Sequence, residues 1–208
     1  MDAQMTGITN TDRMLVKHAA VLLPLIEEEN GAHSLLYEVR AYDLDVQPGD
    51  VCFPGGGVED GEDVREAVLR EAEEELLISR EQITLLETLP DVQGPGAVVH
   101  PFTGLLKDYR GTFAKEETDH VFTVPVAYLK THPPDVYETY YKPELPNDFP
   151  FHKIHDGRRY PLGHRGHDIL FYDIPKEVRC VYGAPDPAKN LPVLWGFTAR
   201  LTYFYLCR

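Results

Sequence analysis

Three glutamates, Glu71, Glu74 and Glu75, are spaced so that a helix would gather their carboxylates on one side. At about 100° per residue, Glu74 lies ~60° from Glu71 and Glu75 lies ~40° to the other side, so the three share an arc of ~100°. Glu73 points roughly the opposite way. Like charges at this spacing cost about a few tenths of a kcal/mol each. The helix either tolerates this repulsion on a solvated face or neutralises it with a cation.

A glycine-rich loop, Pro54-Gly55-Gly56-Gly57, comes before the glutamates. Glycine allows a backbone to approach a ligand closely and to turn sharply. The loop carbonyls could add a ligand to the carboxylates, and the loop amides could contact phosphate. Oxygen ligands without imidazole or thiolate favour Mg²⁺ or Mn²⁺. A diphosphate with a bound cation would fit between loop and helix, whereas the carboxylates taken alone would favour an ordinary acidic surface.

The net negative charge of the chain also indicates that a cation is needed to bind a phosphate-bearing molecule. With 20 Lys and Arg against 34 Asp and Glu, the formal charge is 20 − 34 = −14. Binding along a nucleic-acid backbone requires an array of basic residues, and the sequence has no basic run or stripe. We therefore expect no nucleic-acid partner, and a phosphate-bearing small molecule would need cations from solution.

Cysteine usage and hydropathy predict a cytoplasmic protein. The three cysteines, Cys52, Cys180 and Cys207, form no CxxC pair and have no metal-ligand spacing, which suits a reducing compartment. The first 14 residues are polar and lack a signal-peptide core. The longest apolar stretch near them, residues 19–26, is too short to cross a bilayer. We expect no membrane partner.

The elements that must position the glutamates follow from hydrophobic pattern and turn signals. Asn30-Gly31 predicts a hairpin turn between two strands. Helices are predicted over residues 63–76, 126–130 and, at the C-terminus, about 196–207. Strands are predicted over residues 18–27, 34–41, 51–53, 83–89, 98–106, 121–126, 136–142 and 168–174. No linker divides the chain, so we expect a single domain over residues 1–208, with many strands and few helices in an α+β or α/β/α layered arrangement.

The segment 53–78 reads FPGGGVEDGEDVREAVLREAEEELLI and resembles the Nudix box. That box runs Gly, five residues, Glu, seven residues, Arg-Glu, an apolar residue, any residue, Glu-Glu, any residue, Gly and an apolar residue. Its positions, over residues 56–78, fall on Gly56, Glu62, Arg70, Glu71, Ala72, Glu74, Glu75 and Ile78. Such a match arises by chance on the order of 10⁻⁷ per start site. Leu77 replaces the second glycine, which would usually cap the helix.

The resemblance implies a Nudix-like α/β/α sandwich with a mixed β-sheet and a hydrolase that cuts a diphosphate bond. It implies that Glu71, Glu74 and Glu75 bind Mg²⁺ or Mn²⁺ together with the main-chain carbonyl of Gly55. The metal would orient the diphosphate, draw charge from the leaving phosphate and activate water.

Further roles follow from the same resemblance. Arg70 resembles the residue that holds a glutamate in place by a charge-assisted hydrogen bond, and Glu62 resembles its partner. Arg70, Glu62, Glu71 and Glu74 are therefore the expected catalytic residues within the box. We expect the loop glycines, Gly56 and Gly57, to contact the substrate.

A glutamate outside the box often completes such sites. Glu117, just ahead of the strand at residues 121–126, is our candidate for a catalytic role. An equal alternative is that Glu117 is simply a surface acid in the charged run that begins at Lys115.

Four further segments resemble the coenzyme A diphosphatases of the Nudix family: residues 35–41, 49–56, 122–125 and 194–199. This resemblance implies cleavage of coenzyme A or its derivatives to 3′-phospho-AMP and 4′-phosphopantetheine. Arg40 could bind the 3′-phosphate of coenzyme A, since a planar guanidinium suits phosphate oxygens, or it could be a structural ion-pair partner. The Arg- and His-rich stretch 152–167 could line the substrate entrance or be a plain polar loop.

Two alternatives stay open. The same chemistry could act on ADP-ribose or another nucleoside diphosphate derivative. A Nudix-like domain could also be a nucleotide sensor that binds without turnover, because fold does not fix function. A sensor would be expected to lack a box glutamate or the arginine, and all are present here. The oligomeric state is open, with a homodimer as one candidate.

Overall fold

The computed structural model describes residues 17–94, 97–159, 162–185 and 193–208. Its three α-helices are α1 (Val64–Leu76), α2 (Val126–Thr131) and α3 (Gly196–Leu206). The first eight strands are β1 (Lys17–Glu27), β2 (His33–Arg40), β3 (Val51–Cys52), β4 (Gly55–Gly57), β5 (Ile83–Thr88), β6 (Val92–Gly94), β7 (Ala97–Leu106) and β8 (Thr118–Pro125). The remaining strands are β9 (Asp135–Tyr137), β10 (Tyr140–Tyr141), β11 (His164–Arg165), β12 (Ile169–Tyr172), β13 (Cys180–Tyr182) and β14 (Leu194–Trp195).

The central sheet is mixed, as the sequence predicts. Its strands run in the order β13-β8-β2-β1-β7-β5, with the short strands β3, β4 and β6 paired at the side of β2, β1 and β7. The long pairing of β1 with β7 is parallel, while β1–β2 and β2–β8 are antiparallel. Asn30-Gly31 turns the β1–β2 hairpin, and Gly31 has φ +75°, which a glycine adopts without strain.

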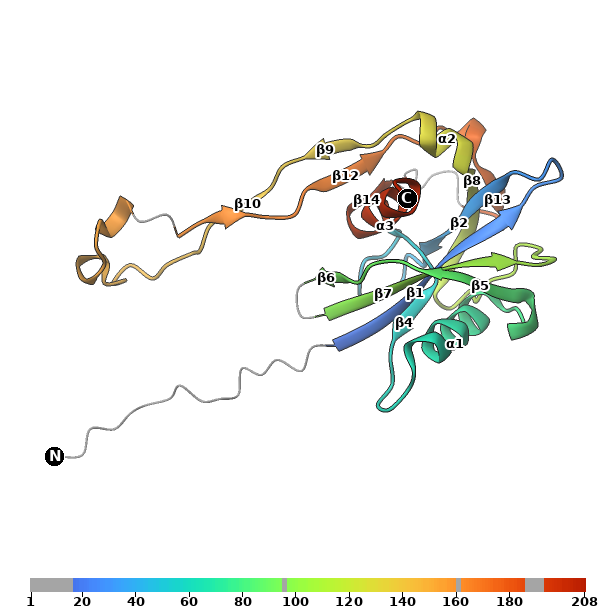
Figure 1. Ribbon diagram of the computed structural model, residues 1–208, viewed down its shortest axis with the longest axis horizontal. Coiled ribbons are helices and arrows are strands. Elements are labelled where there is room, and N and C mark those ends of the chain that lie inside the picture. Colours follow the sequence, from blue (N-terminus) through green and yellow to red (C-terminus); the bar gives the residue numbers. More distant parts are fainter. Residues whose placement is uncertain (1–16, 95–96, 160–161, 186–192) are drawn as a thin grey trace.

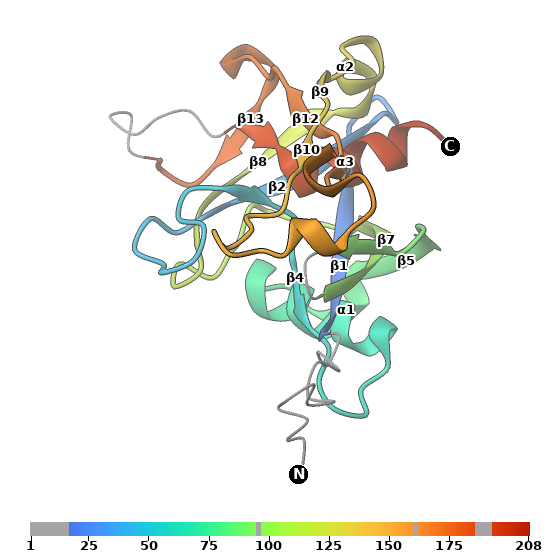
Figure 2. The ribbon, with the colours of Figure 1, turned by 90° about the vertical axis from the view of Figure 1, so that its left-hand side faces the viewer.

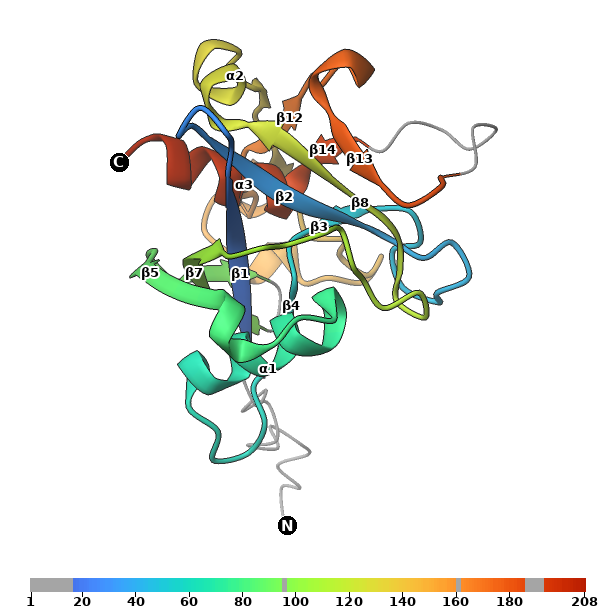
Figure 3. The same cartoon turned by 90° about the vertical axis from the view of Figure 1, so that its right-hand side faces the viewer.

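Helices α1 and α3 cover opposite faces of this sheet, which gives the expected three layers (Figures 1 and 3). Along β2, alternate side chains go to opposite faces. Leu36 therefore joins Val68 of α1 in one buried cluster. Leu35 joins Leu201 of α3 in the other. Because both faces are covered, every side chain from residue 34 to residue 39 is buried.

Tyr37 is the largest buried side chain of β2, and it ties the sheet to α3. Its ring stacks on Phe53 and Phe122, with centroid distances of 4.8 Å and 5.4 Å. Its hydroxyl lies 3.1 Å from the Thr202 Oγ1 of α3. Thr198 donates a hydrogen bond to the Val51 carbonyl at 2.9 Å. These contacts hold α3 against the strand that leads into the glycine-rich loop.

An arm extends from the body of the molecule between α2 and α3. It consists of β9, β10, β11 and β12 with two short 3-10 turns at its tip, and it points toward the viewer in Figure 2. The predicted strand 136–142 is split into β9 and β10, and the predicted strand 168–174 is shortened to β12. None of the helices in the described ranges is both long enough and apolar enough to cross a bilayer.

Helix α1 begins with a side-chain cap and ends at a leucine in the left-handed conformation. The Asp63 side chain caps its first turn by accepting a hydrogen bond from the Arg65 amide at 2.8 Å. At the other end Leu77 takes the left-handed conformation, φ 52° and ψ 47°, that the expected glycine would adopt. The helix thus ends in the usual geometry despite the missing glycine. Thr112 Oγ1 donates to the Leu76 carbonyl and the Ala114 amide donates to the Glu75 carbonyl.

Replacing Leu77 by glycine should stabilise the protein. A non-glycine residue in the left-handed region costs roughly 1–2 kcal/mol, and Leu77 is 58% exposed, so little burial is lost. Allowing for the greater freedom of glycine in the unfolded chain, we expect a gain of about 0.5–1 kcal/mol in the free energy of unfolding, measured with urea.

The matched control is Leu86→Gly, a substitution at another exposed leucine that has a negative φ. It should lower the stability by about 0.5–1 kcal/mol. Equal losses in both variants would show that Leu77 carries no strain.

Candidate functional site

The glycine-rich loop is held directly against α1. The Gly55 amide donates a hydrogen bond to Glu75 Oε2 at 2.7 Å. Gly55 has φ +151°, and a Cβ added there would lie 2.3 Å from the carbonyl oxygen of Ala20 on β1. Only glycine fits this close approach of two strands. The first glycine of the loop therefore joins the acidic face of α1 to the sheet.

Gly56, which has no side chain, leaves space for a second carboxylate of the box, that of Glu71. A Cβ at Gly56 would lie 2.5 Å from the carboxylate atoms of Glu71. The Glu71 carboxylate therefore occupies the space that any other residue at position 56 would fill. By contrast, a Cβ at Gly57 would meet nothing within 4 Å.

Arg70 donates hydrogen bonds to two box glutamates and to the glycine-rich loop. Its Nε and Nη2 donate to the two oxygens of Glu62 at 2.9 and 3.0 Å. Its Nη1 donates to Glu71 Oε1 at 2.8 Å, and Nη2 also donates to the Gly57 carbonyl at 3.0 Å. Arg70 thus has the partners that the resemblance implies, while its catalytic role stays a prediction. The hydrogen bonds from Arg70 hold the pKa of Glu62 below its usual range.

The four glutamates in the second half of the helix have different surroundings. Glu75 is 9% exposed and its carboxylate faces the loop. Glu71 is half-buried beside Arg70, whereas the Glu74 side chain is 64% exposed and lies 3.6 Å from Arg70 Nη1. Glu73 points away, as predicted, and pairs with Arg80 beyond the helix end. Glu71, Glu74 and Glu75 therefore share one side of α1.

Burial and like charges raise the pKa of the inner carboxyls. Burial is the main cause of a rise in the pKa of Glu75 to about 8; the Gly55 amide opposes the rise, and the charges of Glu71 and Glu117 add to it. Burial also raises the pKa of Glu71, against the effect of Arg70. A cation between these groups would relieve both desolvation and repulsion.

Glu117 is brought to the box from outside it. Its carbonyl accepts a hydrogen bond from the Ala41 amide at 2.8 Å, which fixes the loop before β8 beside the end of β2. Its side chain is exposed, and its charge acts on both Glu71 and Glu75. The structure therefore places Glu117 next to the box, which favours our candidate over an unrelated surface acid. Its catalytic role stays a prediction.

Sequence reasoning missed one acidic residue of this site, Glu38. It lies in the middle of β2, is 1% exposed, and its Oε1 has no hydrogen-bond partner in the structure. Burial raises its pKa well above the usual range, and the charges of Glu75 and Glu117 add to the rise. The available signal was a charged residue between two apolar positions of a strand that is buried on both faces.

The donor set fits a hard divalent cation. Within the described ranges, no three acidic, histidine or cysteine side chains are already gathered closely enough to hold a metal ion. The Glu71 and Glu75 carboxylates are instead engaged by Arg70 and by the Gly55 amide. The box glutamates and the Gly55 carbonyl nevertheless offer oxygen ligands, and Glu38 has a buried carboxylate oxygen without a hydrogen-bond partner. These are the donors that Mg²⁺ and Mn²⁺ prefer.

Arg40 and the arginine pair Arg158-Arg159 lie in different parts of the molecule. Arg40 Nε donates to the Val46 carbonyl at 3.2 Å, and the Arg40 charge acts on Glu38 and Glu75, so Arg40 lies beside the acidic cluster. Arg158 and Arg159 lie at the tip of the arm, away from α1 (Figure 1). This position favours the interpretation of residues 152–167 as a plain polar loop over the alternative that they line the substrate entrance of the same chain.

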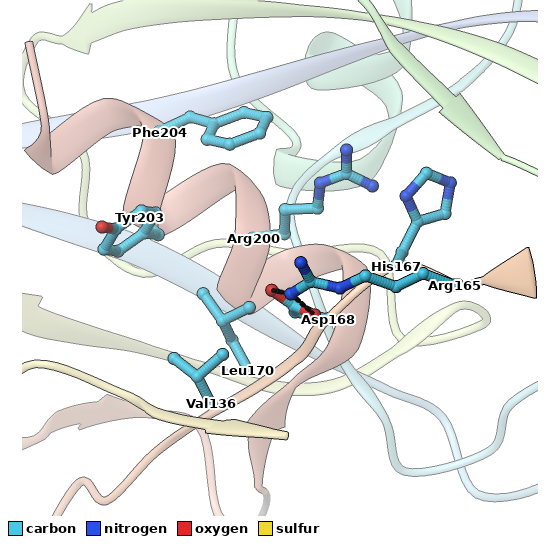
Figure 4. Close-up of a pocket in the computed structure, with 9 residues that line it drawn as sticks. Val136, Arg165, His167, Asp168, Leu170, Arg200, Tyr203 and Phe204 are labelled. Atoms are coloured by element: carbon cyan, nitrogen blue, oxygen red, sulfur yellow. Dashed lines mark hydrogen bonds and ion pairs between the residues drawn. The ribbon is translucent and has the colours of Figure 1, made fainter. Parts of the chain in front are cut away.

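A separate cavity of about 480 Å³ lies between the arm and α3 (Figure 4). Arg165, which pairs with Asp168, enters it from the arm. Arg200, whose guanidinium lies 5.3 Å from the Phe204 ring centroid, enters it from α3. No box residue lines this cavity. It is therefore not the site of the acidic chemistry.

A family comparison identifies the box. A model of the NUDIX domain matches residues 16–154, more than half of the chain. The chain belongs to the Nudix family. Nudix hydrolases act on nucleoside diphosphate derivatives and generally use divalent metal ions. This chain is therefore a Nudix hydrolase.

Several relatives and solved structures are similar to this Nudix hydrolase. The uncharacterised Nudix hydrolase NudL of Escherichia coli O7:K1 is 33% identical over 135 residues, which are 62% of this chain and 69% of the relative. NudL of Shigella boydii serotype 18 shows the same identity and coverage. The Ap4A hydrolase of C. elegans, in a binary complex, has a TM-score of 0.46 and 24% identity over 56% of this chain and 85% of that chain. RenU, a Nudix hydrolase from M. smegmatis, has a TM-score of 0.47 and 24% identity over 56% and 74%.

Glu75→Gln should remove activity while the protein stays folded. The amide keeps the shape of the side chain but gives up a charge that a cation would need, so we expect turnover to fall by about 100-fold or more. Glu73→Gln on the same helix, whose carboxylate faces Arg80, should stay within about twofold of wild type. If Glu75→Gln turned over substrate at the wild-type rate, we would conclude that the acidic face of α1 is an ordinary charged surface without a catalytic role.

The metal-free protein should lose stability as pH rises. The folded-state pKa of Glu75 is raised from 4.5 to about 8, so between these values the folded state binds more protons than the unfolded chain. The free energy of unfolding in chelator therefore falls as pH increases through this window. Urea unfolding from about pH 5.5 to about pH 8.5 should show a steeper fall for wild type than for Glu75→Gln. Parallel pH profiles of wild type and Glu75→Gln would contradict the raised pKa of Glu75.

Proposed function

We propose that this Nudix hydrolase holds Mg²⁺ or Mn²⁺ on Glu71, Glu74, Glu75 and the Gly55 carbonyl and cleaves a diphosphate bond with it. The observation that supports this proposal is the contact of two glycines with two box carboxylates, Gly55 with Glu75 and Gly56 with Glu71. These contacts hold both carboxylates beside the loop that a phosphate chain would approach.

The residues around the cation have separate tasks. When bound, the divalent cation supplies the positive charge that a leaving phosphate and an attacking water require. Arg70 holds Glu71 in position and is itself held by Glu62, so neither partner has to be ordered when substrate binds. The amides of Gly56 and Gly57 contact the phosphates. Glu117, beside the box, accepts the proton of the attacking water.

The substrate that we propose is coenzyme A or one of its derivatives. Two of the segments that resemble coenzyme A diphosphatases, 35–41 and 49–56, lie side by side because β2 pairs with β3, with Glu38 opposite Cys52. The second segment leads directly into the glycine-rich loop. A third segment, 194–199, forms the start of α3, where Thr198 contacts the Val51 carbonyl. The segments therefore meet around the loop that precedes the box.

ADP-ribose or another nucleoside diphosphate derivative is the second candidate. The structure supplies the observation that favours it: Arg40, the residue proposed for the 3′-phosphate, also serves as a counter-charge to Glu38 and Glu75. A sensor without turnover is the third candidate. The complete set of box glutamates with the braced Arg70 favours an enzyme over a sensor.

A substrate panel with Mg²⁺ tests these candidates, with products identified by mass spectrometry and a parallel series in EDTA. We expect coenzyme A to be cut to 3′-phospho-AMP and 4′-phosphopantetheine, and no cleavage in EDTA. Charge-assisted hydrogen bonds to the extra phosphate contribute about 1.5–3 kcal/mol, so coenzyme A should be preferred to dephospho-coenzyme A by about 10- to 150-fold. Faster cleavage of ADP-ribose would contradict the substrate, and full activity in EDTA would contradict the metal.

Arg40→Ala separates the two roles of Arg40. If Arg40 binds the 3′-phosphate, the variant loses the preference for coenzyme A but cuts dephospho-coenzyme A at the wild-type rate. If Arg40 only balances the acidic cluster, both rates fall together and the preference is kept. The ratio of kcat/KM values for the two substrates is the measurement that decides.

A further inference from the structure

The cavity between the arm and α3 has a basic end and an apolar end. Its volume of about 480 Å³ falls within the range of roughly 300–1,000 Å³ that is typical of small-molecule sites. Arg165, His167 and Arg200 lie toward one end, whereas Leu170 and Tyr203 lie toward the other (Figure 4). The cavity therefore offers two kinds of surface to one ligand.

Arg200 enters the cavity from α3 without an acidic partner. Its neighbours in the helix, Ala199 and Leu201, are buried in the core, which fixes the helix face that carries Arg200. Its guanidinium lies near the Phe204 ring, and in the part of the chain that the structure describes no ion pair or side-chain hydrogen bond holds it. A guanidinium has five N–H donors, so this half-buried group can donate to a ligand.

Arg165 is only partly engaged by its neighbours. Its Nη2 donates to the two carboxylate oxygens of Asp168 at 3.0 and 3.1 Å and lies 3.5 Å from Glu138 Oε1. These contacts use one of the guanidinium nitrogens, so Nε and Nη1 keep donors for a further acceptor. Because Arg165 offsets the charge of Asp168, Arg200 leaves the lining net positive in a chain whose formal charge is −14.

The arm side of the cavity is held by hydrogen bonds within the protein. The Gly166 amide donates to the Thr139 carbonyl at 2.8 Å, and the Thr139 hydroxyl donates to the His167 carbonyl. A Cβ at Gly166 would clash with Thr139 Oγ1 and with the Tyr141 ring, so this close approach requires glycine. The backbone that carries Arg165 is therefore in place before a ligand binds, which lowers the cost of ordering it.

We propose that this cavity binds a small organic phosphate monoester, with its phosphate on Arg200 and Arg165 and its organic part against Leu170 and Tyr203. A phosphate monoester carries a charge of about −1.5 to −2 and three acceptor oxygens, so it can accept from two guanidinium groups at once. A carboxylate has two oxygens, and Asp168 already gives Arg165 such a partner. The bound molecule would join the arm to α3. The inference is independent of the proposed function, because no box residue lines the cavity.

Calorimetric titration in EDTA, with phenyl phosphate as the probe, tests the proposal. We expect one phenyl phosphate to bind per chain, at least about tenfold more tightly than inorganic phosphate, because its ring buries apolar surface. Benzoate, which has the same ring but a carboxylate, should bind at least about tenfold more weakly than phenyl phosphate. EDTA removes any cation through which a phosphate could bind at the box.

Arg200→Ala should weaken the binding of phenyl phosphate by about tenfold or more. Arg110→Ala is the matched control, because it removes the same charge from an exposed arginine outside the cavity, and it should stay within about twofold of wild type. If Arg200→Ala does not fold, Arg200→Lys keeps the charge but loses the planar fork, and it should also bind more weakly. Wild-type affinity in the folded Arg200 variants, or benzoate bound as tightly as phenyl phosphate, would overturn the proposal.

Hydrogen exchange locates the bound probe. Phenyl phosphate should slow the exchange of backbone amides in β12 and α3, because it joins the arm to the helix and suppresses local opening. Slowed exchange confined to Gly55–Gly57 would place the phosphate at the glycine-rich loop and would also overturn the proposal.

Discussion

The hydrogen bond from the Gly55 amide to Glu75 is the contact on which the site depends. Gly55 pairs with Val21 of β1, so the bond joins the acidic face of α1 to the centre of the sheet. Without it, the Glu75 carboxylate would lose the donor that the described residues give it while staying buried. The neighbouring contacts follow from the same close approach: Gly56 leaves room for Glu71, and the Gly57 carbonyl accepts from Arg70. Helix, loop and arginine thus form one hydrogen-bonded unit.

This unit could be predicted from the sequence because its contacts are local. The offsets between Arg70, Glu71 and Glu75 follow from the period of a helix, and the loop lies next to that helix in the chain. The three-layer fold was also predictable, since the strand pattern and the position of the box helix indicate it. Leu77 shows that the helix end is set by the surrounding structure, because a leucine adopts the conformation expected of a glycine.

The remainder of the site depends on strand pairing, which the sequence does not specify locally. Glu38 joins the cluster because β2 lies between β3 and β8 and turns position 38 toward α1. Glu117 could be named from its place before a strand, but only the contact of its carbonyl with the Ala41 amide puts it beside the box. For the arm, the sequence predicts two strands separated by a loop, whereas the structure has four short strands, because short segments such as β10 and β11 are stabilised by their partners rather than by their own sequence.

If the proposed cation binds at the acidic cluster, the distribution of charge couples its binding to folding. In the part of the chain that the structure describes, Arg70 and Arg40 are the cations that act on a cluster containing Glu38, Glu71, Glu75 and Glu117. The metal-free fold therefore keeps several acids in a region where their charges are unfavourable, and this cost lowers its stability. A cation that binds only the folded state recovers that cost, so its apparent affinity includes the relief of repulsion as well as the new ligand bonds. In the proposed function, the acids that weaken the metal-free fold are the ones that hold the divalent cation and, through it, the phosphate chain of the substrate.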